Sequence, residues 1–117
     1  MNSKQIGEKG ESIAVDYLIE KGFIVIEKNW RFKHLEIDII ASLKNTLHFV
    51  EVKTRTNQLF GHPEESISEL KMNRLKRAAE AYLIQQPQWE FIQFDVVAIT
   101  LHANEVADLL FIEDVFF

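Results

Sequence analysis

The 117-residue chain contains no cysteine, only two prolines and only four glycines. The lack of cysteine excludes a disulfide framework, a thiolate zinc site and a cysteine nucleophile, and it suits a reducing compartment. The apolar runs are too short to cross a bilayer and the first residues are polar, so we expect a cytoplasmic protein. Because no linker rich in proline or glycine interrupts the chain, we expect a single domain over residues 1–117.

Basic residues are outnumbered, with 13 Lys and Arg against 18 Asp and Glu and a formal net charge of −5. This balance argues against a nucleic-acid partner, since phosphate binding usually leaves a basic footprint. The distribution is uneven, however: residues 28–77 carry ten bases and six acids, whereas residues 78–117 carry seven acids and no base. The middle of the chain is therefore the candidate phosphate-facing region, with ordinary charge scatter as the alternative.

The first part of the chain has the apolar spacing of a helix over residues 3–21, with Ser3 as its cap and Gly22 as its stop. The apolar arc consists of Ile6, Ile13, Ala14, Tyr17 and Leu18. Gly10 lies inside this arc, where close packing would tolerate no side chain. Glu11 lies at the edge of the arc, so its side chain can extend toward whatever the helix packs on.

The rest of the chain alternates between strand-like and helical patterns. Strands are predicted at residues 23–30, 36–41 and 46–55, a second helix at 64–85 after a break at 61–63, and two further strands at 91–100 and 109–116. The connections between the first three strands are short, which predicts an antiparallel meander. The order α-β-β-β-α-β-β indicates an α+β or mixed α/β domain.

Charged side chains share faces in the second and third predicted strands. Because alternate residues of a strand point to the same side, Glu36 and Asp38 point one way and the isoleucines that follow each of them point the other way. Glu51 and Lys53 share a face by the same rule. The short turn between the strands makes them neighbours, so we expect Asp38, Glu51 and Lys53 to form one patch.

This patch has the parts that metal-assisted phosphodiester cleavage requires. Asp38 and Glu51 offer hard oxygen ligands that suit Mg²⁺ or Mn²⁺. Lys53 is a candidate for stabilising the phosphorane charge or helping to deprotonate the attacking water. Glu36 and Glu11 are candidates for holding a second ion or orienting that water. The alternative is a set of solvated surface ion pairs, but clustered acids repel one another without a cation, which favours a site.

Asp38, twelve intervening residues and then Glu51-Val52-Lys53 resemble the PD-(D/E)xK signature of the restriction-endonuclease-like superfamily. An ordered set of motifs over nearly the whole chain resembles the YraN-like family of bacterial proteins. These motifs are Gly7-Glu8-Lys9-Gly10-Glu11, Lys28-Asn29-Trp30-Arg31, Glu36-Ile37-Asp38-Ile39-Ile40, Phe49-Val50-Glu51-Val52-Lys53-Thr54-Arg55, Phe60-Gly61 and Phe94-Asp95-Val96-Val97. The chain is also similar to archaeal Holliday-junction resolvases, which place a glutamate on the first helix.

The resemblance implies a central mixed five-stranded sheet flanked by helices, with Asp38 and Glu51 as metal ligands, Lys53 as the catalytic lysine and Glu11 as an accessory acid. Two departures from the family pattern matter. Leu35 stands where the family usually has Gly before the strand, and Gln93 stands where it often has Arg, which removes one candidate phosphate contact.

Basic residues near the patch are candidates for nucleic-acid binding. Lys71 lies on the inward side of the second predicted helix and is placed to contact the phosphate or the acidic cluster, with a snorkelling lysine as the alternative. The other candidates for tracking a backbone are Arg31, Lys33, Arg55, Arg74, Lys76 and Arg77, each with a solvated charge as its alternative. We assign the four histidines no catalytic role, and we expect Asp95 to be structural, paired with a basic residue of the first helix or strand.

These observations favour a Mg²⁺-dependent or Mn²⁺-dependent endonuclease that hydrolyses phosphodiester bonds of nucleic acid, with branched or structured DNA as the expected substrate. The alternatives are a nuclease-like module that binds nucleic acid or a protein without turnover, and a purely structural interaction domain. Apolar residues crowd the last nine positions, which predicts a symmetric homodimer, with packing of this segment on its own sheet as the alternative.

Overall fold

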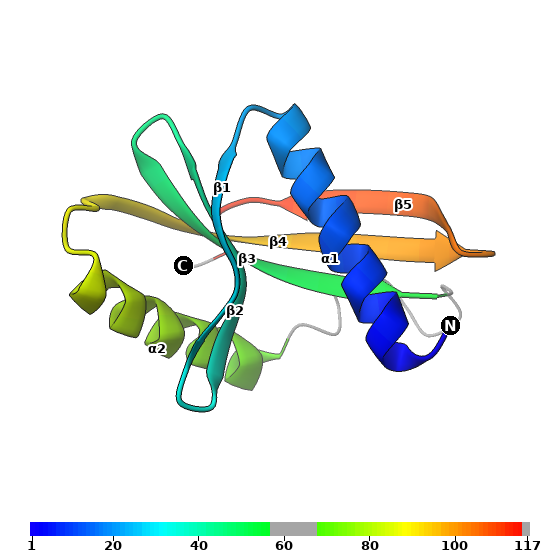
Figure 1. Ribbon diagram of the computed structural model, residues 1–117, viewed down its shortest axis with the longest axis horizontal. Coiled ribbons are helices and arrows are strands. Elements are labelled where there is room, and N and C mark those ends of the chain that lie inside the picture. The colour runs from blue at the N-terminus through cyan, green and yellow to red at the C-terminus, as the bar shows by residue number, and fades with distance from the viewer. Residues whose placement is uncertain (57–67, 116–117) are drawn as a thin grey trace.

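The computed structural model describes residues 1–56 and 68–115 of the chain, and these residues form two helices and five strands (Figure 1). The elements are α1 (Ser3–Glu20), β1 (Ile24–Phe32), β2 (Leu35–Leu43), β3 (Thr46–Arg55), α2 (Glu69–Gln85), β4 (Phe91–His102) and β5 (Glu105–Ile112). This order confirms the predicted mixed α+β class.

The strands form one five-stranded sheet in the order β1-β2-β3-β4-β5. Neighbouring strands are antiparallel except for β3 and β4, which run parallel because α2 carries the chain back between them. The predicted meander of the first three strands is thus confirmed. The order places β3 at the centre of the sheet, so the charged residues near its end are surrounded by structure on both sides.

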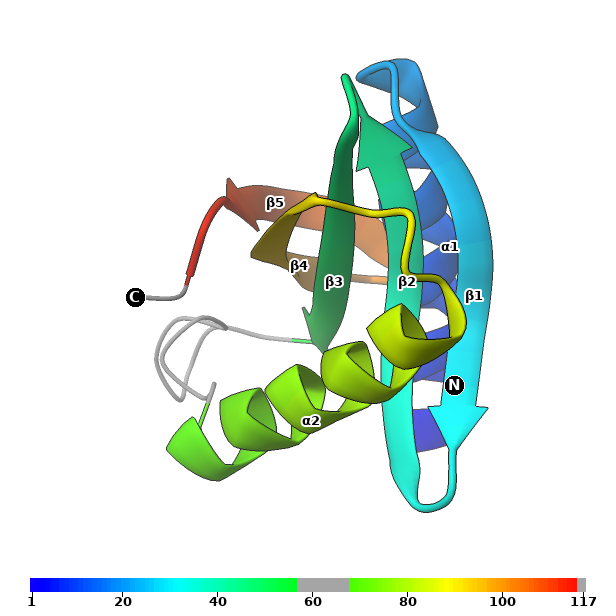
Figure 2. The same ribbon diagram turned by 90° about the vertical axis from the view of Figure 1, so that its left-hand side faces the viewer.

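The helices cover opposite faces of the sheet, with α2 in front and α1 behind in Figure 2. Ala14 and Leu18 of α1 are fully buried against β2, β3 and β4. On the other face Leu75 and Ala78 of α2 are buried against β2 and β3. The sheet therefore separates two apolar layers, which hold its charged residues in fixed positions.

Several element boundaries differ from the sequence prediction, most of them by one or two residues, and three of the differences have an evident local cause or limit. The cap of α1 is Asn2 rather than Ser3, because Asn2 and Gln5 form a reciprocal capping box. Strand β5 begins at Glu105 rather than at residue 109, because a two-residue turn with positive φ at both Ala103 and Asn104 returns the chain at once. Ser68 caps α2, and the predicted start of that helix at residues 64–67 and the break before it lie outside the described residues.

The alternation predicted for β2 is wrong at one position. Ile37 is buried in the layer under α2, whereas Ile39 is buried in the layer under α1. The change lies opposite Asn29 of β1, which has a φ of 52° and so departs from the extended backbone. The alternation of β2 thus changes where the neighbouring strand is irregular.

The C-terminal apolar segment packs partly on its own sheet. Leu109 and Phe111 contact the layer under α1, and the Phe111 ring lies 5.8 Å from that of Tyr17. Leu110 keeps 41% of its surface exposed, and residues 116–117 lie outside the described part of the chain. Packing on the sheet therefore accounts for Leu109 and Phe111, and the homodimer stays a prediction. Neither of the two described helices is long and apolar enough to span a membrane.

Gly10 is the point of closest approach between α1 and β3. A Cβ atom on Gly10 would lie 1.8 Å from Oγ1 and 2.9 Å from Cβ of Thr54, whereas a Cβ atom on Gly7 would meet nothing within 4 Å. We expect Gly10→Ala to lower the free energy of unfolding by about 1–3 kcal/mol, because the helix must move away from the sheet. Urea unfolding measures this change.

Gly7→Ala is the matched control for this prediction. It lies one turn earlier in the same helix and should raise the free energy of unfolding by about 0.5–1 kcal/mol, because alanine loses less backbone entropy than glycine. Equal stabilisation by the two substitutions would show that the helix does not pack on Thr54 as closely as described.

Candidate functional site

The candidate site lies where β2 and β3 separate. Their pairing runs from Leu43 opposite Thr46 to Ile39 opposite Val50, within two strands that are fully described. Beyond this point a side chain replaces a backbone partner, because Oδ2 of Asp38 accepts a hydrogen bond of 2.8 Å from the Val52 N–H. Charged residues line the opening that results, in the middle of a mainly apolar sheet.

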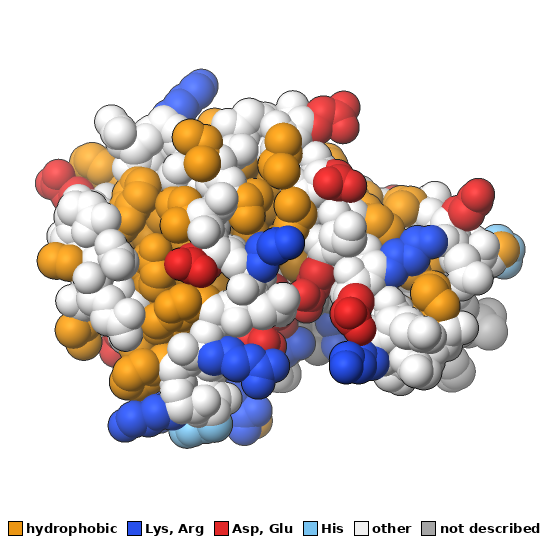
Figure 3. Space-filling view, in the orientation of Figure 1, with side chains coloured by type: hydrophobic (Ala, Val, Ile, Leu, Met, Phe, Trp, Pro, Cys, Tyr) orange, Lys and Arg blue, Asp and Glu red, His pale blue; other side chains and the backbone are white. Residues whose placement is uncertain are grey.

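Four carboxylates line one pocket of about 330 Å³ at this opening, which we call the acidic pocket. They are Glu11, Glu36, Asp38 and Glu51, contributed by α1, β2 and β3. Figure 3 shows Asp and Glu side chains gathered near the middle of one face, set between Lys and Arg side chains. The structure thus brings together all four acids predicted for the site.

Burial and mutual repulsion raise the pKa values of two of these acids. Asp38 is only 9% exposed, and burial together with the charge of Glu51 raises its pKa to about 8. Burial also raises the pKa of Glu11, with contributions from the charges of Glu36 and Glu51, while a hydrogen bond to the Asn29 side chain opposes the shift. A cation in the pocket would remove this repulsion.

Each of the other two acids has a basic partner. Nζ of Lys71 lies 2.7 Å from Oε1 of Glu51, whose side chain is 8% exposed. Although burial lowers the pKa of Lys71, the hydrogen bond and charge of Glu51 raise it above the ordinary value. Arg31 forms a 3.0 Å ion pair with Glu36 near the surface. Lys71 therefore contacts the acidic cluster, which is one of the two roles predicted for it.

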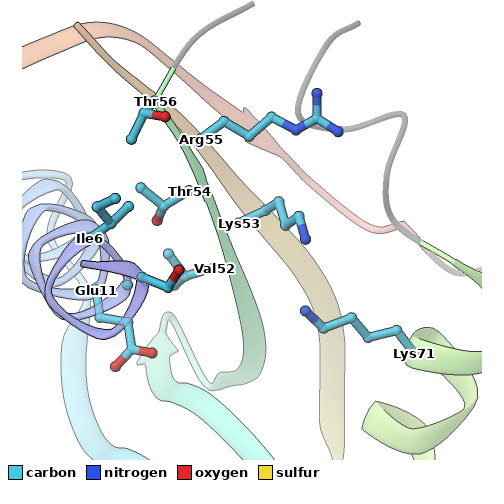
Figure 4. A pocket seen from close by; sticks show the side chains of 10 residues that line it. Ile6, Glu11, Val52, Lys53, Thr54, Arg55, Thr56 and Lys71 are labelled. Carbon is cyan, nitrogen blue, oxygen red and sulfur yellow. The ribbon is translucent and has the colours of Figure 1, made fainter. Parts of the chain in front are cut away.

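Lys53 lies in an adjoining pocket of about 440 Å³, which we call the basic pocket (Figure 4). Lys53, Arg55 and Lys71 line it, and the ammonium groups of the two lysines point toward each other. Burial and the charges of Lys71 and Arg55 lower the pKa of Lys53, against an opposing contribution from Glu51. Glu11 lines both pockets, so they meet beside α1.

The remaining predicted basic residues divide into two groups. Arg74 lines the acidic pocket, one helical turn from Lys71. Lys33 instead lies over the Phe32 ring and lines a separate pocket with Arg77. Of these residues, Arg74 therefore lies at the acidic pocket, whereas Lys33 and Arg77 line another pocket.

Sequence reasoning did not single out Asn29 or His34. Asn29 bonds to Glu11 through its side chain, and His34 lines the acidic pocket. An asparagine inside a run of β-formers was the one available signal for Asn29, since asparagine tolerates positive φ. His34 carries no comparable signal, because its place depends on where α2 packs.

The basic partner predicted for Asp95 is wrong. Asp95 is fully buried and bonds to Nδ1 of His48 at 2.5 Å, to Nε2 of Gln93 and to the backbone N–H of Asp114. His48 lies on β3, so the partner comes from neither α1 nor β1. The expectation that Asp95 is structural agrees with this placement, which lies beyond the two pockets along β3 and β4.

The donor set of the acidic pocket fits a hard divalent cation. Within residues 1–56 and 68–115, no group of three or more His, Cys, Asp or Glu side chains is arranged to hold a metal ion. Mg²⁺ usually takes only one or two protein carboxylates and keeps several waters. Asp38 and Glu51, which repel each other and are 9% and 6% exposed, supply that number of ligands.

The fold and the pockets define a small mixed α+β protein that gathers carboxylates and lysines at an opening in a five-stranded sheet. A model of the Uncharacterised protein family UPF0102 matches residues 10–99. The chain therefore belongs to this family, as its YraN-like motifs indicate.

Relatives that carry the name UPF0102 protein occur in several bacteria. One from Dictyoglomus turgidum is 48% identical over 86% of this chain and 86% of its own length. One from Clostridium botulinum is 43% identical over 92% of each chain. One from Caldicellulosiruptor saccharolyticus is 41% identical over 99% of this chain and 100% of its own length. The similarity thus covers most of the chain in each of these relatives.

Proposed function

We propose that this protein is a divalent-metal-dependent nuclease of the restriction-endonuclease-like superfamily, which hydrolyses phosphodiester bonds of nucleic acid. One observation carries the proposal: two buried carboxylates, Asp38 and Glu51, lie at a break in the sheet next to a pocket lined by Lys53. A charge arrangement of this kind is costly for stability and suits an anionic substrate with a metal ion.

The position of each residue in the two pockets suggests its role in the reaction. Asp38 and Glu51 would hold Mg²⁺ or Mn²⁺, which supplies a Lewis acid for a phosphate oxygen. Lys53 lies beside them in the basic pocket, where its ammonium can stabilise charge that develops on the phosphate. Glu11 lies between the two pockets and is placed to orient the attacking water. The Glu36 side chain is 34% exposed, and its role is to add negative charge for a second ion.

The substrate we propose is DNA of branched or structured shape. Arg55, Lys71 and Arg74 line the two pockets on the side of β3 and α2 and would contact the phosphates. Arg31 lies at the rim through its ion pair with Glu36. This local group of bases supplies a binding surface despite the net charge of −5.

A cleavage assay tests the proposal. Labelled single-stranded, linear, flap and four-way-junction DNA, together with matched RNA, should be incubated with the protein and Mg²⁺, Mn²⁺ or EDTA. We expect metal-dependent cleavage of at least one substrate and none with EDTA. Binding without cleavage on every substrate and with every metal would instead favour a nucleic-acid-binding module of nuclease-like fold.

Lys53→Ala should reduce cleavage by about 10²- to 10³-fold and leave nucleic-acid affinity nearly unchanged, since one lysine adds little to a surface of many charges but stabilises the transition state. Single-turnover rates and fluorescence anisotropy measure the two quantities. Lys21→Ala is the matched control, because Lys21 lies over the Tyr17 ring at the far end of α1. An unchanged cleavage rate in Lys53→Ala would remove Lys53 from the mechanism.

A further inference from the structure

Lys71 is shared between the acidic and basic pockets. It extends from the first turn of α2 and lines both openings. Its ammonium contacts Oε1 of Glu51 at 2.7 Å, while 43% of its side-chain surface stays exposed. A long side chain that is this exposed can leave its partner without disrupting the core.

The contact with Lys71 balances the negative charge of Glu51. Its side chain is 8% exposed, and its carboxylate lies close enough to Asp38 and Glu11 to raise the pKa values of both acids. A buried carboxylate of this kind needs a cation. Lys71 supplies it here, and its ammonium contacts Oε1 of the carboxylate that would hold the metal ion.

The basic pocket offers Lys71 a second position. In Figure 4 the ammonium groups of Lys53 and Lys71 point toward each other across the opening. Two cations that face each other attract an anion between them, and a phosphate oxygen accepts hydrogen bonds from both. An ammonium that leaves Glu51 therefore has a partner within the same opening.

We propose that Lys71 is a displaceable counter-ion, which holds Glu51 until a divalent cation takes that carboxylate and then binds a phosphate of the nucleic acid beside Lys53. The inference rests on the proposed function and adds to it a coupling between metal binding and nucleic-acid binding. Lys71 competes with the metal when nucleic acid is absent, and it contributes to phosphate binding when the metal is present. Metal and nucleic acid should thus bind with positive cooperativity.

Metal binding to the intact protein without nucleic acid tests the first half. Isothermal titration with Mn²⁺ should show about tenfold tighter binding in Lys71→Met than in the wild type, because the competing ammonium is gone. Lys53→Met is the matched control: it removes the same charge from the same region but no ion pair with Glu51, and we expect a threefold gain or less. Asp38→Asn gives the baseline for binding elsewhere on the protein.

Binding of a labelled four-way DNA junction tests the second half. Ca²⁺ replaces Mg²⁺ so that the junction is not cleaved. Addition of Ca²⁺ to the metal-free protein should raise the junction affinity of the wild type, and this gain should be about ten times larger than the gain for Lys71→Met. Lys71 is half-exposed and methionine favours helices, so the variant should fold, as circular dichroism will show.

The outcomes separate this inference from the proposed function. If the wild type binds no Mn²⁺ at the acidic pocket, the proposed function fails together with the inference. If the wild type binds Mn²⁺ but Lys71→Met binds it no more tightly than Lys53→Met does, only the counter-ion role is overturned. An equal gain in junction affinity with Ca²⁺ in the wild type and Lys71→Met overturns the phosphate role.

Discussion

Replacement of Asp38 by Asn should abolish cleavage and at the same time make the metal-free protein more stable. The loss of activity, on the order of 10³-fold or more, follows from removing a proposed metal ligand, because a bound metal ion contributes several kcal/mol to the stabilisation of the transition state. The gain in stability follows from removing a buried charge, while the asparagine carbonyl can still accept the Val52 N–H bond. Cleavage rates and thermal unfolding in EDTA measure the two effects.

The stability gain should depend on pH. The pKa of Asp38 is raised to about 8 in the folded protein, against about 4 in an unfolded chain. Between these values the folded state keeps a proton that the unfolded state has released, so stability of the wild type falls as pH rises from 4 to 8. Asparagine does not titrate, and Asp38→Asn should therefore gain little at pH 4 and about 2 kcal/mol or more at pH 9.

Mn²⁺ should reverse the order of the two proteins. If the proposed site binds Mn²⁺, the metal should stabilise the wild type by about 2.7 kcal/mol at a hundredfold excess over its dissociation constant, and it should stabilise Asp38→Asn far less. A variant that is less stable than the wild type in EDTA at pH 9 would show that Asp38 carries no unfavourable charge. Equal stabilisation of the two proteins by Mn²⁺ would remove Asp38 from the metal site.

Asp95→Ala should cost about 3–5 kcal/mol of folding free energy, the largest loss of stability we expect from any single substitution discussed here. The carboxylate is fully buried and accepts hydrogen bonds from Gln93 and from the Asp114 backbone in addition to its contact with His48. Its removal leaves these groups without a hydrogen-bond partner in the interior of the protein. Urea unfolding at pH 7 measures the loss.

Asp108→Ala is the control for this prediction, because Asp108 is an exposed aspartate on β5 and its removal should change stability by about 0.5 kcal/mol or less. A double-mutant cycle of Asp95→Ala with His48→Ala should give a coupling energy of about 1 kcal/mol or more. Losses that simply add would show that the two residues contribute independently, despite the 2.5 Å contact.

The sequence alone was sufficient for several features that depend on neighbouring residues, although it missed the Asn2 cap of α1 and the turn before β5. The bounds of β3 at Thr46–Arg55 were predicted without error. The rule that alternate residues of a strand share a face placed Val50 and Val52 on one side of β3 and Glu51 and Lys53 on the other. The structure agrees, since both valines are buried in the layer under α1. These are local properties, set by backbone geometry and apolar spacing, and they require no knowledge of the rest of the chain.

Features that join distant parts of the chain required the tertiary structure. Ile37 and Ile39 of β2 are buried on opposite faces of the sheet, and the change lies opposite Asn29 of the neighbouring strand, which has positive φ. His48 meets Asp95 because α2 returns the chain so that β3 and β4 run parallel.

The same reason applies to the contact between Lys71 and Glu51. Helical spacing placed Lys71 on the inward side of α2, but the choice of Glu51 as its partner depends on how α2 crosses the sheet. Residue types and their spacing were thus enough to nominate the acids and the lysines of the candidate site. Which acid meets which base was decided by packing, since an ion pair forms only between groups that the buried apolar layers bring within a few ångströms.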